Sequence, residues 1–244
     1  MLTDGAKRGI VMRTESNEMG NVMAEFHVAE IFESINGEGR FAGELASFVR
    51  LKGCNLHCSY CDTAWACTGD ASCQVVTEEQ ICRRVLDSGI RRVTLTGGEP
   101  LAHPEIEVLL KRLSEEESLQ VEIETNGSIP IRPFRHYKNS PSFTIDYKLP
   151  GSGMEEHMCD ENFRGITSAD TVKFVVSHRA DLERAEQVMT EYSLSDRCAV
   201  FFSPVFGLIE PVEIVEFLRE RCLNGVKLQL QLHKFIWDSQ TRGV

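Results

Sequence analysis

This chain of 244 residues has no long uninterrupted apolar run, no internal repeat and no excess of basic side chains. A transmembrane helix is therefore not expected, because about 20 consecutive apolar residues are needed to cross a bilayer. Acidic residues outnumber basic ones by 37 to 26, and the formal net charge of −11 argues against a general nucleic-acid-binding surface. The chain also lacks a Pro-, Gly- or Ser-rich linker, so we expect one domain over residues 23–244.

Residues 1–22 lack apolar clustering and periodicity, and we interpret them as a loose N-terminal extension. They also lack the apolar core of a secretory signal peptide. The nine cysteines are an odd number, which argues against a disulfide framework in a chain without such a signal. We therefore expect a cytoplasmic protein with no membrane or nucleic-acid partner, whose crowded cysteines bind a metal or take part in chemistry.

Short apolar runs alternate with amphipathic stretches along the rest of the chain. The composition predicts strands at 47–51, 92–96, 120–125, 142–146, 171–177, 199–203 and 227–232. Helices are predicted at 77–88, 104–116, 181–192 and 211–221, the first opened by a capping box of Thr77 and Gln80. This alternation predicts about six parallel βα units, fewer than the eight of a complete barrel. We therefore predict an α/β fold, a partial, open TIM-like (βα)6 barrel, with functional residues at the C-terminal ends of its strands.

Three of the nine cysteines crowd into one short loop after the predicted strand at 47–51. Cys54, Cys58 and Cys61 have the spacing C-x3-C-x2-C, and three such thiolates can hold three corners of an iron–sulfur cube. A complete cubane site normally has four cysteine ligands, but Cys67 and Cys73, the nearest others, lie in a polar loop without a matching spacing. The pattern therefore predicts a cluster with one iron open to a ligand that is not protein.

A structural zinc site is one alternative for this loop, and unliganded thiols are another. Structural zinc usually takes four ligands in two pairs, and a fourth ligand from within the loop would have to be His57, in a cramped position between Cys54 and Cys58. On that interpretation the chain is a zinc-stabilised binding module without catalysis. A brown colour of the anaerobically purified protein distinguishes the cluster from colourless zinc.

A second motif, Gly97-Gly98-Glu99-Pro100, follows the predicted strand at 92–96. Two glycines at a strand end let the backbone approach a ligand closely, and the carboxylate beside them can accept a hydrogen bond from an ammonium group. Taken alone, the motif is a turn before the helix predicted at 104–116. However, it follows the first predicted strand after the cysteine loop, so both motifs are expected at the C-terminal ends of successive strands.

The two motifs together resemble the signature of the radical S-adenosylmethionine (SAM) superfamily, with Tyr60 as the aromatic residue before the third cysteine. The resemblance implies a 4Fe-4S cluster on the three loop cysteines, with SAM chelating the open iron. In that superfamily the reduced cluster passes one electron to SAM, which is cleaved to a 5′-deoxyadenosyl radical. The Gly-Gly-Glu-Pro motif there binds the SAM amino group, which implies this role for Gly98 and Glu99.

Residues 30–39 (EIFESINGEG) resemble the EIF-x-S-x-QGEG opening of the 7-carboxy-7-deazaguanine synthase family, with Asn36 in place of the usual Gln. Residues 61–63 (CDT) match that family's C-D-S/T step. Residues 144–148 (TIDYK) resemble its T-I-S-P-K segment, with Asp and Tyr in place of Ser and Pro. The tail at 232–244 resembles the family's L-H-K-x-x-W ending and its terminal R-G-V. The resemblance extends over residues 23–244, nearly the whole chain.

This family resemblance implies a carbon–nitrogen lyase that converts 6-carboxy-5,6,7,8-tetrahydropterin into 7-carboxy-7-deazaguanine with loss of ammonia, in queuosine and 7-deazapurine biosynthesis. It also implies a homodimer and an electron donor such as flavodoxin or ferredoxin. An Mg²⁺ ion is expected on Thr63. The implied SAM-binding residues are Tyr60, Asp62, Gly98, Glu99, Asp146, Tyr147, Lys148, Ser203 and Pro204. The implied substrate-binding residues are Ile35, Asn36, Gly37, Arg50, Thr96 and Val244.

An activase of glycyl-radical enzymes is a second enzyme hypothesis, because it shares the cysteine loop and a similar small size. Such an activase would lack the opening at 30–39 and the substrate-reaching tail. The six remaining cysteines are scattered along the chain, and we expect buried free thiols that behave as small apolar groups. They are Cys67, Cys73, Cys82, Cys159, Cys198 and Cys222.

Overall fold

The computed structural model describes residues 24–238 and 241–244, so the extension expected at 1–22 lies outside the described residues. The strands are β1 (Glu25–Ile35), β2 (Leu45–Leu51), β3 (Gln74–Thr77), β4 (Arg92–Gly97), β5 (Gln120–Thr125), β6 (Ser142–Tyr147), β7 (Thr171–Val176), β8 (Ala199–Pro204) and β9 (Val226–Leu228). The helices are α1 (Ala64–Cys67), α2 (Glu78–Asp87), α3 (Ile106–Ser114), α4 (Asp160–Arg164), α5 (Arg179–Tyr192), α6 (Pro211–Glu220) and α7 (His233–Ile236). No helix in this part of the chain has the length and apolar content needed to cross a membrane.

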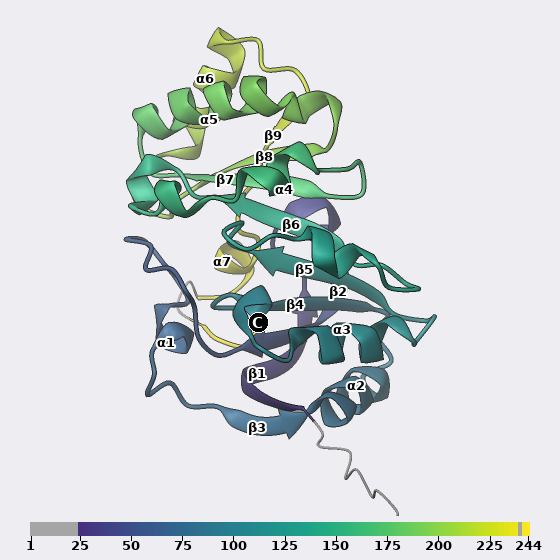
Figure 1. Cartoon of the computed structure of the whole chain (residues 1–244). Helices are drawn as coiled ribbons and strands as arrows, with labels where there is room; N and C mark the ends of the chain where they lie inside the picture. Colours follow the sequence, from purple (N-terminus) through teal and green to yellow (C-terminus); the bar gives the residue numbers. More distant parts are fainter. Residues whose placement is uncertain (1–23, 239–240) are drawn as a thin grey trace, which may run out of the picture.

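The strands form one sheet in the order β3-β1-β2-β4-β5-β6-β7-β8-β9 (Figure 1). Each neighbouring pair from β2 to β9 is parallel, whereas β1 runs antiparallel to both β2 and β3. The order does not close on itself, since β3 and β9 stand at opposite edges. The predicted α/β class with a mostly parallel, open sheet is therefore confirmed.

Local signals explain most of the element boundaries. The capping box predicted for α2 is present: Gln80 N donates to Thr77 Oγ1 at 3.2 Å, and Thr77 N donates to Gln80 Oε1 at 2.9 Å. Two predicted elements differ clearly from the structure. Helix α3 begins after Pro104, because residues 100–102 form a separate 3-10 turn. The strand predicted at 227–232 ends at Leu228, because the following residues leave the sheet to contact the segment after β1.

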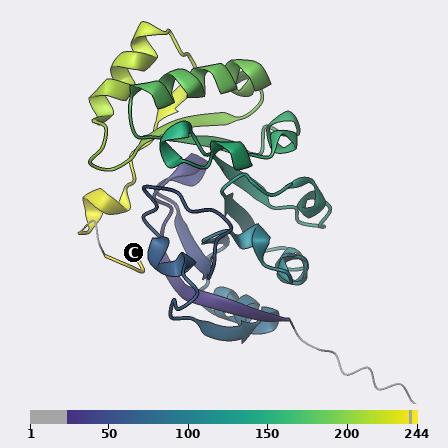
Figure 2. The same cartoon turned by 60° about the vertical axis from the view of Figure 1, so that its left-hand side comes forward.

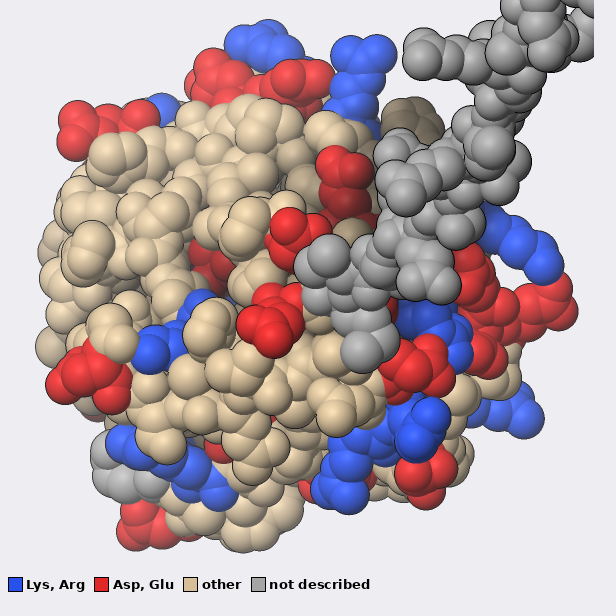
Figure 3. All heavy atoms as spheres, turned by 60° about the horizontal axis from the view of Figure 1, so that its bottom comes forward, with Lys and Arg blue, Asp and Glu red and all other residues tan. Residues whose placement is uncertain are grey.

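Surface charges of both signs are mixed on the face of the molecule shown in Figure 3. Ion pairs such as Arg112 with Glu79 and Arg84 with Glu33 bring opposite charges together between helices and strands. Exposed pairs of this kind contribute little to stability, so the fold depends on its interior.

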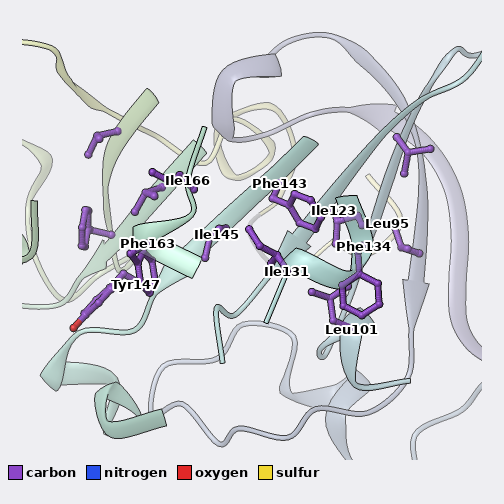
Figure 4. Close-up of a cluster of buried hydrophobic side chains, with 14 of the residues drawn as sticks. Leu95, Leu101, Ile123, Ile131, Phe134, Phe143, Ile145, Tyr147, Phe163 and Ile166 are labelled. Atoms are coloured by element: carbon purple, nitrogen blue, oxygen red, sulfur yellow. The ribbon is translucent and has the colours of Figure 1, made fainter. Parts of the chain in front are cut away.

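The outer face of the sheet is apolar and packs under the helices. Figure 1 shows α2, α3 and α4 in front of the sheet and α7 behind it. Alternate side chains of the parallel strands point to the helix side, where they form one continuous buried core (Figure 4). Members from successive strands include Leu95, Ile123, Phe143, Ile145, Tyr147, Phe174 and Phe202.

The inner face of the same strands is polar, which is unusual for a parallel sheet. Parallel strands covered on both faces normally read as continuous apolar runs. Here the alternate positions carry buried hydroxyl and charged groups: Thr94, Thr96, Glu122, Thr144 and Lys173. Burying polar groups costs free energy unless they are hydrogen-bonded, so each of these groups needs a partner on the inner face.

The core depends on large aromatic side chains, and this can be tested at Phe174. Its side chain is fully buried and contacts the rings of Tyr147 and Phe202, at centroid distances of 5.6 and 5.5 Å. We expect Phe174→Ala to lower the free energy of unfolding by about 3–5 kcal/mol, because it leaves a cavity. Phe235→Ala is the matched control, since Phe235 is 64% exposed and should change stability by less than about 0.5 kcal/mol. Equal effects of the two substitutions in urea unfolding would contradict the described packing.

Candidate active site

The cysteine loop follows β2 and is held on three sides by backbone hydrogen bonds. Gly53 N donates to Ala66 O of α1 at 3.0 Å, and Gly53 O accepts from Glu99 N at 2.9 Å. Further along, Ser59 bonds to the segment after β6: its N donates to Ser152 O at 3.1 Å and its Oγ to Gly151 O at 2.8 Å. These contacts fix the loop to the C-terminal ends of the strands, where the sequence predicted the functional residues.

The three loop cysteines are free and half-buried. Hydrogen bonding to Cys67 lowers the pKa of both Cys54 and Cys61 to about 6, although burial acts in the opposite direction. Leu56 N also donates to Cys54 Sγ at 3.4 Å. Burial raises the pKa of Cys58. Thiolates and N–H donors to sulfur are what iron–sulfur clusters require, so this donor set fits the cluster.

A single metal ion fits the loop less well than a cluster does. Among residues 24–238 and 241–244, no three His, Cys, Asp or Glu side chains converge to hold one ion. A structural zinc ion needs four ligands within about 2.3 Å of the metal. His57, the loop residue considered as a zinc ligand, is exposed. A multi-iron cluster instead separates its thiolates onto different corners, which does not require such convergence.

Two glycines let the loop after β4 pass against the cysteine loop. A Cβ atom on Gly98 would lie 2.0 Å from Gly53 O and 2.8 Å from Cys54 Cβ. At Gly97 the φ angle is +154°, and a Cβ atom would lie 2.3 Å from Leu51 O. The glycines therefore permit close backbone approach between the two loops, in addition to any approach to a cofactor.

Glu99 is 2% exposed and is held by three donors. Its carboxylate accepts from Leu101 N at 3.0 Å, Thr125 Oγ1 at 2.8 Å and Asn126 N at 2.6 Å. Burial raises its pKa to about 7, against the effect of these hydrogen bonds. The structure therefore shows Glu99 joining the loops after β4 and β5, and its predicted contact with a SAM amino group stays a prediction.

Asn126 is a site residue that the sequence reasoning missed. Its Nδ2 lies 2.9 Å from Asn55 Oδ1 and 3.7 Å from Cys54 Sγ, so it contacts the cysteine loop directly. Ser128, two residues on, accepts from Asn55 Nδ2 at 2.8 Å. The polar run Thr125–Ser128 at the end of the predicted strand 120–125 was the signal that could have identified it.

A charged cluster lies on the inner face next to these loops. Asp146 Oδ2 accepts from Lys148 Nζ at 2.8 Å, and Asp146 Oδ1 lies 3.1 Å from Lys173 Nζ, which also pairs with Glu38. Burial alone would raise the pKa of Asp146, but the two lysines outweigh it and lower the pKa. Asp146 and Lys148 were predicted, whereas Lys173 and Glu38 were not among the predicted site residues.

The residues predicted for substrate binding lie around the same interior, with most of their polar groups already paired. Arg50 Nε donates to Glu30 Oε1 at 2.8 Å. Asn36 is 1% exposed, and its amide lies between Thr94 Oγ1 at 2.9 Å and Glu122 Oε2 at 3.5 Å. The structure therefore gives Asn36 a buried partner on each side of its amide.

Other predicted substrate-binding residues are placed by the backbone. Ile35 ends β1 opposite Leu45 of β2. Thr96, 6% exposed, is on the inner face of β4, in register with Arg50 of β2. Gly37 O accepts from Leu232 N at 3.1 Å, which brings the C-terminal segment to the opening predicted from the sequence.

The remaining predicted SAM and magnesium residues are distributed around this centre. Tyr60 donates from its hydroxyl to Val175 O of β7 at 3.1 Å. Thr63 Oγ1 lies 3.6 Å from Cys61 Sγ. Ser203, 1% exposed, and Pro204 end β8. The Tyr147 side chain lies in the outer core against Phe163, so only its backbone faces the interior.

The C-terminal segment crosses from β9 back to β1 and the cysteine loop. Gln229 Oε1 accepts from Gly39 N at 2.6 Å. Asp62 lies 3.3 Å from Gln231 Nε2 and 3.6 Å from Lys234 Nζ, and these contacts lower its pKa although burial opposes them. Figure 2 shows the C-terminus beside α1, where the Arg242 guanidinium lies 4.2 Å from the ring centroid of Trp65. The half-buried Val244 ends this segment.

The six other cysteines are free, but the expectation that they are buried is wrong for most of them. Cys82 is buried, Cys222 is exposed, and the others are half-buried. The reason is position, because these residues lie in loops and at element ends rather than on the core side of strands and helices. The Cys67 thiol donates to Thr63 O at 3.4 Å, one turn back in α1.

Comparison with known proteins identifies the class that this fold and loop define. The family model described as the radical SAM superfamily matches residues 48–173, which contain the cysteine loop and strands β4 to β6. The crystal structure of QueE from Escherichia coli is similar in fold, with a TM-score of 0.65, 21% identity, and coverage of 85% of this chain and 94% of that one. The fold is therefore that of the radical SAM superfamily, whose members use a 4Fe-4S cluster and SAM.

The relatives in sequence narrow the class to one family. The 7-carboxy-7-deazaguanine synthase of Clostridium acetobutylicum is 48% identical over 219 residues, which cover 90% of this chain and 99% of that protein. The synthase of Chlorobaculum tepidum is 37% identical over 225 residues, covering 91% and 98% of the two chains. This chain belongs to the 7-carboxy-7-deazaguanine synthase family.

The close approach of the two loops can be tested at Gly98. We expect Gly98→Ala to abolish incorporation of iron, because the added methyl group would overlap Gly53 O and displace Cys54. Gly69→Ala is the matched control, since a Cβ atom there meets no atom within 4 Å. Iron per chain after anaerobic reconstitution is the measurement. Full iron content in Gly98→Ala would show that the loops do not depend on this contact.

The buried carboxyl of Glu122 should make stability depend on pH. Burial and the charge of Glu124 raise the Glu122 pKa from 4.5 to about 7. Between these values the folded chain holds a proton that the unfolded chain has lost, so stability falls as the pH rises through this window. We expect Glu122→Gln to reduce that fall by up to about 3 kcal/mol. The exposed Glu156→Gln should leave it unchanged, and identical pH profiles of wild type and Glu122→Gln in urea unfolding would contradict the expectation.

Proposed function

We propose that this protein converts 6-carboxy-5,6,7,8-tetrahydropterin into 7-carboxy-7-deazaguanine with release of ammonia, as a carbon–nitrogen lyase of the queuosine pathway. The observation that carries the proposal is the 48% identity to a 7-carboxy-7-deazaguanine synthase over nearly the full length of both chains. That identity includes far more than the 126-residue region shared with the superfamily at large, which spans residues 48–173. It therefore supports the same substrate as well as the same cofactor.

The polar interior suits a substrate of this kind. A carboxylated pterin offers one negative group and a rim of hydrogen-bond donors and acceptors. Arg50, Lys148 and Lys173 supply positive charge, with Arg50 in the planar geometry that matches a carboxylate. Each of these cations already has an acidic partner, as in Arg50 with Glu30 and Lys173 with Glu38. These acidic partners keep the cations from being buried unpaired while no substrate carboxylate is bound.

The chain's own residues would hold the cofactors and exclude water. Cys54, Cys58 and Cys61 would ligate the cluster, and the backbone of Gly98 with the inner-face groups Asp146 and Lys148 would position SAM. When bound, the cluster and SAM would supply the radical that removes a hydrogen atom from the substrate. The C-terminal segment, fixed to Asp62 through Gln231 and Lys234, would cover the interior and keep solvent from the reaction.

An Mg²⁺ ion on Thr63 is part of the proposal. Mg²⁺ usually keeps several waters and takes few protein ligands, so one hydroxyl group beside the substrate carboxylate is a reasonable ligand set. Thr63 stands at the N-terminal end of α1, next to Cys61. The adjacent Asp62 is paired with Lys234, so the hydroxyl of Thr63 is the better candidate of the two neighbours.

The partners proposed for the reaction are an electron donor of the flavodoxin or ferredoxin type and a second copy of the chain. The donor is needed because cluster reduction requires one electron from outside the protein. The homodimer rests on the family resemblance.

Anaerobic turnover tests the proposed function. Reconstituted protein should form 7-carboxy-7-deazaguanine from the carboxytetrahydropterin in the presence of SAM, a strong reductant and Mg²⁺, and the rate should fall when Mg²⁺ is omitted. Cys58→Ala is the control, since loss of a cluster ligand should abolish turnover. Cleavage of SAM without formation of the deazaguanine would reject the substrate while retaining the superfamily chemistry.

A further inference from the structure

A single buried lysine joins two acidic side chains that lie far apart in the sequence. Lys173 is on the inner face of β7, directly opposite Asp146 of β6 in the parallel register. Its Nζ lies 3.1 Å from Asp146 Oδ1 and also pairs with Glu38, which lies 135 residues earlier in the chain. The ammonium group of Lys173 therefore connects the end of β6 to the segment that follows β1.

The two oxygens of the Asp146 carboxylate are held by different cations. Oδ2 accepts from Lys148 Nζ at 2.8 Å, and Oδ1 pairs with Lys173. The Asp146 side chain is nevertheless 21% exposed, against 12% for the side chains of Lys148 and Glu38 and 9% for that of Lys173. A carboxylate oxygen has two lone pairs, so each Asp146 oxygen can still accept a hydrogen bond from a ligand. Asp146 is thus the most accessible member of the cluster, and Lys173 is the most buried.

Lys173 is not needed to hold the backbone of the segment after β1. Arg40 in that segment donates from its guanidinium to Ala169 O at 2.8 Å and to Ser168 O at 2.9 Å, just before β7. The segment therefore stays attached to β7 when the lysine is removed. Loss of the ammonium group should release the two acidic side chains and leave the backbone around them in place.

We propose that Lys173 is a positioning residue for the cofactor SAM, because it holds the Asp146 carboxylate in the orientation that accepts hydrogen bonds from the ribose hydroxyls. The inference rests on the proposed function, in which Asp146 positions SAM, and it does not depend on the identity of the substrate. The terminal torsion of an aspartate has a broad preference, so a cation on one oxygen leaves the carboxylate plane free to turn, whereas cations on both oxygens fix it. An acceptor that is already fixed loses less conformational freedom when its ligand binds.

Equilibrium binding of SAM to the anaerobically reconstituted protein, without substrate or reductant, tests the inference. Lys173→Met keeps a long side chain and removes its charge and its donors. We expect this substitution to weaken the Kd for SAM about 10- to 100-fold, as for loss of one hydrogen bond to a charged group, while iron per chain stays at the wild-type level. Lys138→Met is the matched control, because the Lys138 side chain is 71% exposed, and it should bind SAM as the wild type does.

A double-mutant cycle with Asp146→Asn shows whether Lys173 acts through Asp146. If it does, Lys173→Met should weaken SAM binding much less in the Asp146→Asn background than in the wild type. Equal effects in the two backgrounds would mean that the lysine acts on the cofactor by another route, and they would overturn the inference. An unchanged Kd in Lys173→Met would overturn it as well.

A charge-balanced variant covers the case in which Lys173→Met does not fold. The single substitution leaves one buried carboxylate without a counter-charge, which is destabilising. Combining Lys173→Met with Glu38→Gln removes one charge of each sign, and weakened SAM binding is again expected. Wild-type affinity in this double variant would show that Lys173 only balances charge, which contradicts a positioning role. Because substrate is absent throughout, failure of this inference is distinguishable from failure of the proposed reaction, which is measured as formation of the deazaguanine.

Discussion

The backbone contact between the loop after β2 and the loop after β4 positions the rest of the site. Gly98 has no side chain where a Cβ atom would lie 2.0 Å from Gly53 O, and Glu99 N donates to the same oxygen at 2.9 Å. Glu99 extends the link to the loop after β5, from which Asn126 returns to Cys54. Three strand ends are thus joined around the thiols. The buried carboxyl of Glu99 is destabilising by itself, which its raised pKa reflects, and three hydrogen bonds offset that cost.

The polar inner face of the sheet is a second feature on which the site depends. Its charges are placed in opposed pairs: Asp146 with Lys148 and Lys173, and Lys173 with Glu38. A buried charge without a partner costs several kcal/mol, and this paired network leaves no member of it unpaired before a ligand binds. The apolar outer face under the helices supplies most of the stability, so the two faces of each strand have separate roles.

The C-terminal segment returns from β9 to the residues that follow β1 and to the cysteine loop. The hydrogen bonds from Gly39 N to Gln229 Oε1 and from Leu232 N to Gly37 O join residues that are 190 or more positions apart in the sequence. Contacts with Asp62 and Trp65 then tie the segment to the residues beside Cys61. The position of the C-terminal segment is therefore tied to that of the cysteine loop.

Local patterns in the sequence determined the parallel α/β class, the capping box of α2, the three-thiol loop and the Gly-Gly-Glu motif, because each depends on neighbouring residues or on periodicity alone. Family resemblance added the candidate ligands. Only the tertiary structure decided which of these polar residues meet: Glu38 pairs with Lys173 across 135 residues, and Asn126 reaches Cys54 across 72. Sheet order and the return path of the C-terminal segment create such contacts, and neither leaves a local signal.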